Sequence, residues 1–446
     1  MAEVTSASMN LAVFLTACGN YHHLGWRHAD AWVDASTNFE RWLEFARIAE
    51  AAKLDMLFIA DQIAIVGGDE LEAIENSSKA NRFEPMTLLS ALATHTTGIG
   101  LAGTCATSYS EPYTIARMFA SLDHLCGGRA AWNCVTGGQQ EEAQNFSLKS
   151  HAPHELRYER AAEFADVVMG LWDSFDDDAL IQDKASGRFF DASKIHTLNH
   201  KGKHFSVRGP LNVSRSPQGR PVIIQAGGSE ATITMGARIA DVIFTAQADI
   251  DAAKTFYRQI KQAVKEQGRP PEDVRVMPGL SVFVAPTREE AQAKFDDLHQ
   301  MLDREDAVAS LSRLLGGVDL SGYDPQGPMP ALEGNDLRMS GPGTFVRIGQ
   351  ENGYSLAQVA MQAKAARNHC LVIGSVADVA DHMEHWFRSG AADGFNLLPA
   401  IVPGTLEDFC TLVVPELRAR GLFRADYAGT TLRENMGLSR PASRRW

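Results

Sequence analysis

The stretch that decides the fold runs from residue 127 to residue 158 and begins Gly127-Gly128-Arg129-Ala130-Ala131-Trp132-Asn133-Cys134-Val135-Thr136-Gly137-Gly138. It predicts a buried strand that ends in side chains able to form hydrogen bonds. A polar loop follows, and His151, His154, Arg157 and Tyr158 lead into the next helix. In parallel α/β proteins, ligands bind at the C-terminal ends of the strands. The stretch therefore predicts a ligand site at a strand end, and an ordinary capped loop is the alternative.

Seven further apolar runs are short enough to be buried strands, and helical patterns separate most of them. We expect these strands at residues 10–16, 54–60, 99–106, 221–225, 241–245, 279–285 and 394–399. Strands that alternate with helices in this way predict an α/β fold, a TIM (β/α)8 barrel. We expect one barrel domain over residues 1–446, with insertions at about 176–216 and 304–349 and a flexible tail at 438–446. Within the second insertion, the loop 315–349 is predicted to be a mobile lid.

Bulk properties exclude several classes of function. The net charge is −13 and the longest basic block is Arg444-Arg445, which argues against a nucleic-acid surface. No apolar stretch approaches the length of about 20 residues that spans a bilayer. The polar start, Met1 to Met9, shows no signal peptide, and the six scattered cysteines are expected to be reduced thiols. We therefore expect a cytoplasmic protein that binds neither nucleic acid nor membrane.

The segment Gly227-Gly228-Ser229-Glu230 is expected between a strand and a helix. Backbone N–H groups at a helix start, together with the Ser229 hydroxyl, favour phosphate. Ser229 can also simply cap the helix, and the two interpretations are compatible. A nucleophile elbow of a serine hydrolase, Gly227-x-Ser229-x-Ala231, is a weaker match because its second glycine is missing.

Two other patterns do not lead to a site. His196, His200 and His204 recur every four residues, but their segment is strand-like rather than helical, so we expect no metal site. Gly98-x-Gly100-x-x-Gly103 precedes and occupies a strand. A dinucleotide fingerprint would instead follow a strand and open a helix, so we reject that interpretation.

A set of short motifs runs along the chain from about Asn10 to Gly437. The main ones are Trp26-Arg27-His28, Leu57-Phe58-Ile59-Ala60-Asp61, Gly128-Arg129-x-x-Trp132-Asn133-x-Val135-Thr136, His154-x-x-Arg157-Tyr158, Pro221-Val222-Ile223-x-Gln225-Ala226-Gly227 and Asp393-Gly394-Phe395-Asn396-Leu397. Together they resemble the nitrilotriacetate monooxygenase branch of the bacterial luciferase-like flavin proteins. That resemblance implies a TIM barrel with insertions, in agreement with the strand pattern.

The resemblance also implies a two-component monooxygenase. Such an enzyme takes reduced FMN from a separate NAD(P)H:flavin reductase, forms a flavin C4a-hydroperoxide with O₂, and inserts one oxygen atom into a small organic substrate. Members of the family commonly form homodimers or homotetramers. The alternatives are a deazaflavin-dependent oxidoreductase of the same superfamily, a serine hydrolase, or a flavin-binding protein without turnover.

By the family's pattern, the flavin-contacting positions are Asp61, Thr104, His154, Tyr158 and Ser229. We expect His154, Tyr158 and Ser229 at the phosphate and ribityl end, where hydrogen bonds to charge are strongest. Gly228 joins them through the phosphate-type turn. Asp61, Thr104 and Asn133 are expected nearer the isoalloxazine ring.

The loop from Cys18 to His28, after the first strand, is rich in aromatic and imidazole side chains. We expect it to face the reactive edge of the flavin. Its candidate catalytic residues are Cys18 and His22, and its candidate substrate contacts are Tyr21, His23 and Trp26. An aromatic plug that closes the barrel mouth is the alternative. Because the alkane-oxidising members carry an extra residue before the Trp26-Arg27-His28 equivalent, the resemblance does not identify the substrate.

Overall fold

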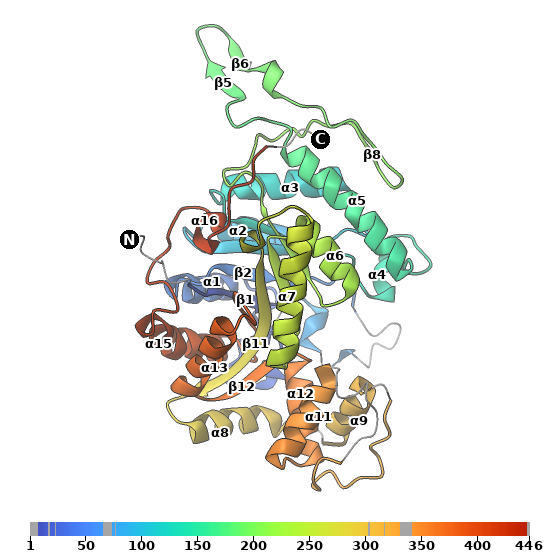
Figure 1. Ribbon diagram of the computed structural model, residues 1–446, viewed down its shortest axis with the longest axis vertical. Coiled ribbons are helices and arrows are strands. Elements are labelled where there is room, and N and C mark those ends of the chain that lie inside the picture. The colour runs from blue at the N-terminus through green and yellow to red at the C-terminus, as the bar shows by residue number, and fades with distance from the viewer. Residues whose placement is uncertain are drawn as a thin grey trace.

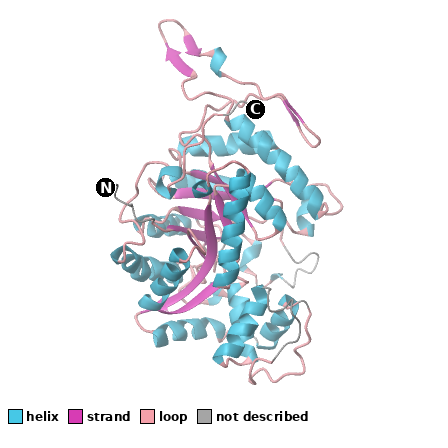
Figure 2. Ribbon diagram, viewed as in Figure 1, coloured by secondary structure: helices cyan, strands magenta, loops and turns pink. Residues whose placement is uncertain are grey.

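The computed structural model describes residues 8–443 except 17, 23, 66–73, 76, 302–303, 316 and 331–340. Eight parallel strands close into a barrel, and helices surround it (Figure 1, Figure 2). The barrel strands, in order around the ring, are β1 (Asn10–Leu15), β2 (Met56–Ile59), β3 (Gly100–Ala106), β4 (Ala130–Val135), β9 (Val222–Ala226), β10 (Val242–Thr245), β11 (Arg275–Ala285) and β13 (Gly394–Leu397). Pairing of β13 with β1 completes the ring, so the predicted TIM barrel is confirmed.

Helices of the outer layer follow the strands along the chain. They include α1 (Phe39–Ala51), α2 (Pro85–Ala93), α3 (Pro112–Leu125), α5 (His154–Trp172), α6 (Glu230–Ile239), α7 (Ile250–Glu266), α8 (Arg288–His299), α13 (Val376–Arg388), α14 (Gly404–Asp408) and α15 (Val414–Ala419). Good caps mark several starts. Asn38 and Asp249, for example, accept hydrogen bonds from backbone N–H groups of α1 and α7.

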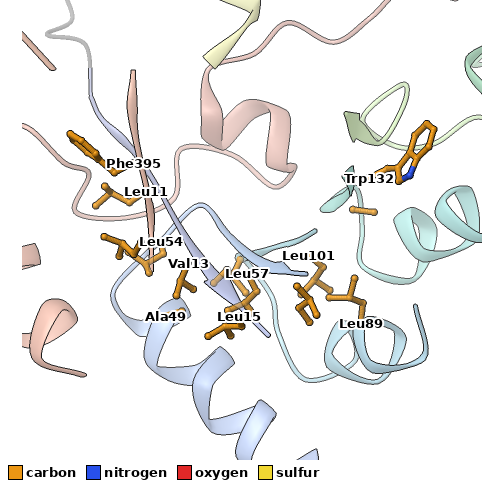
Figure 3. Close-up of a cluster of buried hydrophobic side chains, with 14 of the residues drawn as sticks. Leu11, Val13, Leu15, Ala49, Leu54, Leu57, Leu89, Leu101, Trp132 and Phe395 are labelled. Atoms are coloured by element: carbon orange, nitrogen blue, oxygen red, sulfur yellow. The ribbon is translucent and has the colours of Figure 1, made fainter. Parts of the chain in front are cut away.

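The alternation of side chains along β1 explains how the core is divided. Leu11, Val13 and Leu15 point outward and pack against the helix layer, where α1 contributes Ala49 (Figure 3). Ala12 points inward and belongs to a second cluster inside the barrel, against which Phe14 packs. Most residues of the barrel strands are therefore buried on one side or the other, as expected for a parallel sheet covered by helices.

One strand of the sheet was missed by the sequence pattern. β12 (Cys370–Ser375) pairs with the C-terminal half of β11, from Leu280 to Ala285, whereas β10 pairs with the N-terminal half. The seventh strand was expected at 279–285, but β11 begins at Arg275. A longer β11 is what allows two partners to follow one another along the same edge.

The N-terminal end of the barrel is closed by the last helix, α16 (Leu432–Met436). Leu432, Met436 and Leu438 pack among the inward-facing side chains of the strands. Beside them, Arg433 forms a buried two-fold ion pair with Asp241, which directly precedes β10. The open end of the barrel is therefore the C-terminal end of its strands.

The first insertion forms two hairpins that project from the barrel (Figure 1). They are β5 (Leu180–Asp183) with β6 (Arg188–Phe190), and β7 (His200–Lys201) with β8 (Ser206–Val207). The three histidines of this insertion each face a carboxylate: His196 faces Asp176, His200 faces Glu163 and His204 faces Glu159. No group of residues suited to a metal ion occurs in the described part of the chain.

In and just after the predicted second insertion, a small core of its own is built by α9 (Arg304–Leu314), α11 (Gly341–Asn352) and α12 (Leu356–Ala366), the last of which lies beyond residue 349. Residues 331–340, in the middle of the predicted lid, lie outside the described residues. The lid and the domain boundaries therefore stay predictions.

Part of the predicted flexible tail makes contacts with the barrel. Ser439 hydrogen bonds to Asp273, and Arg440 pairs with the exposed Asp177. Residues 444–446 lie outside the described residues. The flexibility of this tail stays a prediction.

Candidate functional site

Three of the predicted cofactor residues lie at the C-terminal ends of adjacent strands. Asp61 follows β2, Thr104 lies in β3, and Asn133 lies opposite Thr104 in β4. The Asn133 amide Nδ2 donates to Thr104 Oγ1 over 2.9 Å. Asn133 is buried, and within the described ranges its Oδ1 has no hydrogen-bond partner. Because buried acceptors in folded proteins are usually hydrogen-bonded, an unpartnered Oδ1 indicates that a ligand supplies the donor.

A pocket of about 350 Å³ opens beside these strands. Asp61 and Thr104 line it from the strand ends, and Tyr21 lines it from the first loop. Burial raises the pKa of the Asp61 carboxyl, and the charge of Arg82 opposes that shift only in part. The predicted ring end and one predicted substrate contact therefore share one cavity.

The predicted phosphate end is built around the turn between β9 and α6. Ser229 caps α6, and its Oγ accepts from the Thr232 backbone N–H over 3.2 Å. The Tyr158 hydroxyl lies 3.4 Å from Thr232 Oγ1, and the His154 ring lies against the Tyr158 ring with centroids 4.6 Å apart. His154, Tyr158 and Ser229 are therefore brought together through Thr232.

Gly227 has a backbone conformation that few other residues adopt, with φ +138°. A Cβ atom there would lie 2.6 Å from Thr232 Oγ1. Gly228 is less constrained, because its Cβ would meet Thr245 Oγ1 at an ordinary 3.6 Å. The turn thus needs glycine at its first position. The Thr232 N–H is taken by the Ser229 cap, so Glu230 and Ala231 are left to present first-turn N–H groups of α6 at the barrel mouth.

The ring end and the phosphate end lie on neighbouring strands. Asn133 of β4 pairs with Ile224 of β9, two residues before the end of that strand. Arg157, next to Tyr158 on α5, donates from Nη1 to the Gly137 carbonyl over 2.5 Å, and Gly137 lines the 350 Å³ pocket. All the predicted cofactor residues therefore surround the same open end of the barrel.

The candidate residues of the loop from Cys18 to His28 do not all line the same pocket. Cys18 and Trp26 line a separate pocket of about 320 Å³, away from Asp61 and Thr104. Burial and the charge of Asp34 raise the pKa of Cys18 to about 11, and its Sγ donates to the Trp32 carbonyl over 3.2 Å. A thiol in that state is protonated at neutral pH and is a poor nucleophile.

His22 is buried, with its ring against that of His299 at a centroid distance of 4.9 Å. It does not line the 350 Å³ pocket. His23 lies outside the described residues. Of the four candidates in this loop that the structure describes, only Tyr21 lines the cavity of Asp61. The catalytic roles of Cys18 and His22 stay predictions.

The 350 Å³ pocket is also lined by three basic residues that the sequence motifs did not predict, namely Lys79, Arg82 and Arg367. They come from irregular segments far apart in the chain, and no motif surrounds them. Only a fold could place them together. The same pocket is also lined by two carboxylates, Asp61 and Glu142, so its lining carries one more basic group than acidic groups in a protein of net charge −13.

The hydrolase alternative finds no support in the geometry. Ser229 Oγ contacts Thr232, and no histidine or carboxylate hydrogen bonds to it among the described residues. A serine nucleophile needs an adjacent base.

Among the described residues, no helix has both the length and the apolar character needed to span a membrane.

Comparison with known proteins agrees with this geometry. The family model described as luciferase-like monooxygenase matches residues 20–393. The chain is 46% identical to N-acetyl-S-(2-succino)cysteine monooxygenase of Bacillus subtilis (strain 168), over 98% of both chains. It is 42% identical to nitrilotriacetate monooxygenase component A of Aminobacter aminovorans, over 97% of both.

A solved structure of riboflavin lyase, with modified FMN and riboflavin, is also similar. Its TM-score is 0.82 at 34% identity, and the match covers 98% of this chain and 97% of that one. The family match spans most of the barrel, and the relatives match end to end. The chain therefore belongs to the luciferase-like monooxygenase family and is a flavin-dependent monooxygenase.

Proposed function

We propose that this enzyme binds reduced FMN at the open end of the barrel and, with O₂, inserts one oxygen atom into a small organic substrate. A separate NAD(P)H:flavin reductase would supply the reduced FMN, as the name "component A" of one relative suggests. The observation that carries the proposal is the buried, unpartnered Oδ1 of Asn133, at the same barrel end as the β9–α6 turn. Oligomeric assembly stays a prediction.

The residues at the turn fit the phosphate end of FMN. Gly227 and Gly228 leave room for an anion to approach the backbone, because neither carries a Cβ. The first-turn N–H groups of α6, with the Ser229 hydroxyl, provide donors at the positive end of the helix dipole. Tyr158 and His154 would complete the contacts from α5.

The strand ends fit the isoalloxazine ring. A reduced flavin ring carries N–H groups, and Asn133 Oδ1 is an acceptor without a donor in the described part of the chain. Asp61 and Thr104 would lie beside it. When bound, the reduced flavin supplies the electrons that activate O₂ for oxygen insertion.

Aromatic side chains at the pocket floor would keep water away from the reacting atoms. Phe14 lines the pocket and contacts Phe58, Phe244 and Tyr21, with ring centroids 5.4, 5.7 and 6.1 Å apart. A dry floor strengthens electrostatic interactions and limits wasteful hydrolysis.

The formation of an oxygenated product tests the proposal. Purified protein is mixed with FMN, NADH and an added flavin reductase, and a panel of aminopolycarboxylates, sulfones, alkanes and aromatic compounds is screened for oxygenated products by mass spectrometry. We expect one oxygenated product that needs the protein, the reductase and FMN together. Product formation with a deazaflavin cofactor in place of FMN, or in the absence of any flavin, would contradict the proposal.

Substitution of Ser229 by alanine is expected to weaken binding of reduced FMN by about 1 to 3 kcal/mol, because a hydrogen bond to a charged group is lost. Fluorescence titration under anaerobic conditions measures the effect. Ser375→Ala is the matched control, since Ser375 caps α13 in the same way outside the proposed site. Equal FMN affinity in both variants would remove Ser229 from the phosphate site.

A further inference from the structure

The mouth of the 350 Å³ pocket gathers basic side chains from two distant segments. Lys79 lies in the short 3-10 helix η3 (Ser78–Ala80), Arg82 follows it, and Arg367 comes directly after α12. All three line the pocket together with Tyr21 and Asp61. We call them the basic trio. Their convergence is a property of the fold, because about 285 residues separate Arg82 from Arg367.

The basic trio forms no ion pair with a carboxylate among the residues that the structure describes. No carboxylate in the described ranges lies within 4.0 Å of any of the three side chains. Lys79 Nζ donates to the Tyr21 carbonyl over 3.3 Å, and Arg82 Nη2 donates to the Lys79 carbonyl over 2.5 Å. Neutral carbonyls satisfy some of the donors, and the charge of Asp61 acts on Arg82 from beyond ion-pair distance.

Lys79 and Arg82 are half-buried, whereas Arg367 is exposed. Two fully buried arginines of this chain do have carboxylate partners. Arg220 pairs with Asp173, and Arg433 pairs with Asp241. Burying a charge is costly unless it is paired, and folded proteins usually provide the partner themselves. Lys79 and Arg82 depart from this pattern at a place where a ligand is expected. Arg129, which is buried elsewhere, also departs from it, since its guanidinium donates to carbonyls and to the Thr96 hydroxyl.

The positive charges of the trio lie close enough to repel one another. Burial, followed by the charges of Arg367 and Arg82, lowers the pKa of Lys79 to about 7. Burial also lowers the pKa of Arg82, although Asp61 opposes the shift. An anion bound between these groups would relieve the repulsion.

The backbone at Arg367 adopts an energetically unfavourable conformation. Arg367 adopts φ +47° and the next residue, Asn368, adopts φ +67°, both in the left-handed region. Glycine is the usual residue at such a helix end, because a Cβ there is unfavourable. The conformation places the Arg367 guanidinium over the Tyr21 ring, with Cζ 5.4 Å from its centroid. Strained residues of this kind cluster at ligand sites.

We propose that the basic trio binds a carboxylate of the substrate, so that the enzyme acts on a small organic acid held at the pocket mouth. Guanidinium groups hold carboxylates through two parallel hydrogen bonds, and that geometry fixes the rest of the substrate relative to Asp61 and Thr104. The inference rests on the proposed function, because the flavin must occupy the inner part of the same site. The trio determines specificity and takes no part in the electron transfer.

The test uses the protein loaded with oxidised FMN, so that no turnover occurs. Calorimetric titration with succinate, a small dicarboxylate, is compared with titration by succinamide, its neutral analogue. We expect succinate to bind and succinamide not to bind. Arg82→Met and Arg367→Met should each raise the Kd for succinate by about tenfold or more. Arg82→Lys should fall between wild type and Arg82→Met, since it keeps the charge but loses the paired geometry.

Lys184→Met is the matched control, because Lys184 is exposed in the β5–β6 hairpin and its loss changes the net charge equally. It should bind succinate as the wild type does. FMN and riboflavin affinities of every variant are measured in parallel. Unchanged FMN affinity in Arg82→Met and Arg367→Met, together with weaker succinate binding, supports the proposal.

Three results would overturn it. In the first, the wild type binds FMN normally but binds succinate and succinamide alike or not at all, which leaves the proposed function intact. In the second, Arg82→Met and Arg367→Met lose FMN affinity but keep riboflavin affinity, which would assign the trio to the flavin phosphate. In the third, the wild type binds no FMN, and the proposed function falls together with this inference.

Discussion

Substitution of Arg433 by methionine is expected to lower the free energy of unfolding by about 3 to 5 kcal/mol. Arg433 Nη1 and Nη2 donate to the two oxygens of Asp241 over 3.0 and 2.7 Å, and both side chains are buried. Methionine fills a similar volume but leaves a buried carboxylate without its two-fold partner. Arg269, 3.8 Å from Asp241, compensates only in part.

Loss of this ion pair should also weaken the packing of α16, because Arg433 holds that helix in the N-terminal end of the barrel. The chain segment that carries Leu432 and Met436 closes the inner core. Urea unfolding followed by circular dichroism measures the change as a shift in the midpoint.

Arg440→Met is the control for this experiment. Arg440 lies a few residues later in the same terminal segment and pairs with Asp177, but both side chains are about half exposed. An exposed pair contributes less than about 1 kcal/mol. Equal midpoints for Arg433→Met and Arg440→Met would show that α16 does not stabilise the barrel in the way described.

The second large effect is expected at Gly227. Gly227→Ala should raise the Kd for FMN by about a hundredfold, because alanine is strained at φ +138° and its Cβ would overlap Thr232 Oγ1. Relief of that overlap must move the turn or Thr232, and Thr232 links Ser229 to Tyr158. Riboflavin, which lacks the phosphate, should lose much less affinity.

Gly187→Ala provides a control with the same kind of backbone cost. Gly187 has φ +70° in the β5–β6 hairpin, and nothing lies within 4 Å of a Cβ built there. It should bind FMN as the wild type does. Fluorescence titration of both variants checks the prediction, and wild-type FMN affinity in Gly227→Ala would mean that the turn does not hold the phosphate.

The barrel could be predicted from the sequence because each of its strands is an apolar run of the right length between polar turns. β12 could not, since Cys370–Ser375 starts shortly after α12 and contains the weak strand formers Gly374 and Ser375. The short run resembles a connection between two helices. Its strand conformation is imposed by pairing with the extended edge of β11, a tertiary effect.

The site residues, like the strands, could be predicted from the sequence only in part. Asp61, Thr104 and Asn133 could be located because strand ends of a parallel barrel converge, whatever the loops do. Cys18 and Tyr21 lie three positions apart in one loop, yet Cys18 turns towards Trp32 whereas Tyr21 reaches the pocket. Loop geometry of this kind depends on contacts that sequence does not reveal. The same reason explains why Lys79, Arg82 and Arg367 were missed.

We expect one end of the barrel to hold FMN, with its phosphate at the β9–α6 turn and its ring at the ends of β2, β3 and β4. A crystal structure of the protein with oxidised FMN tests this most directly. We predict phosphate density within hydrogen-bond distance of Ser229 Oγ and the ring beside Asp61, Thr104 and Asn133. Phosphate density at Arg82 and Arg367, or FMN bound away from these strand ends, would contradict the account.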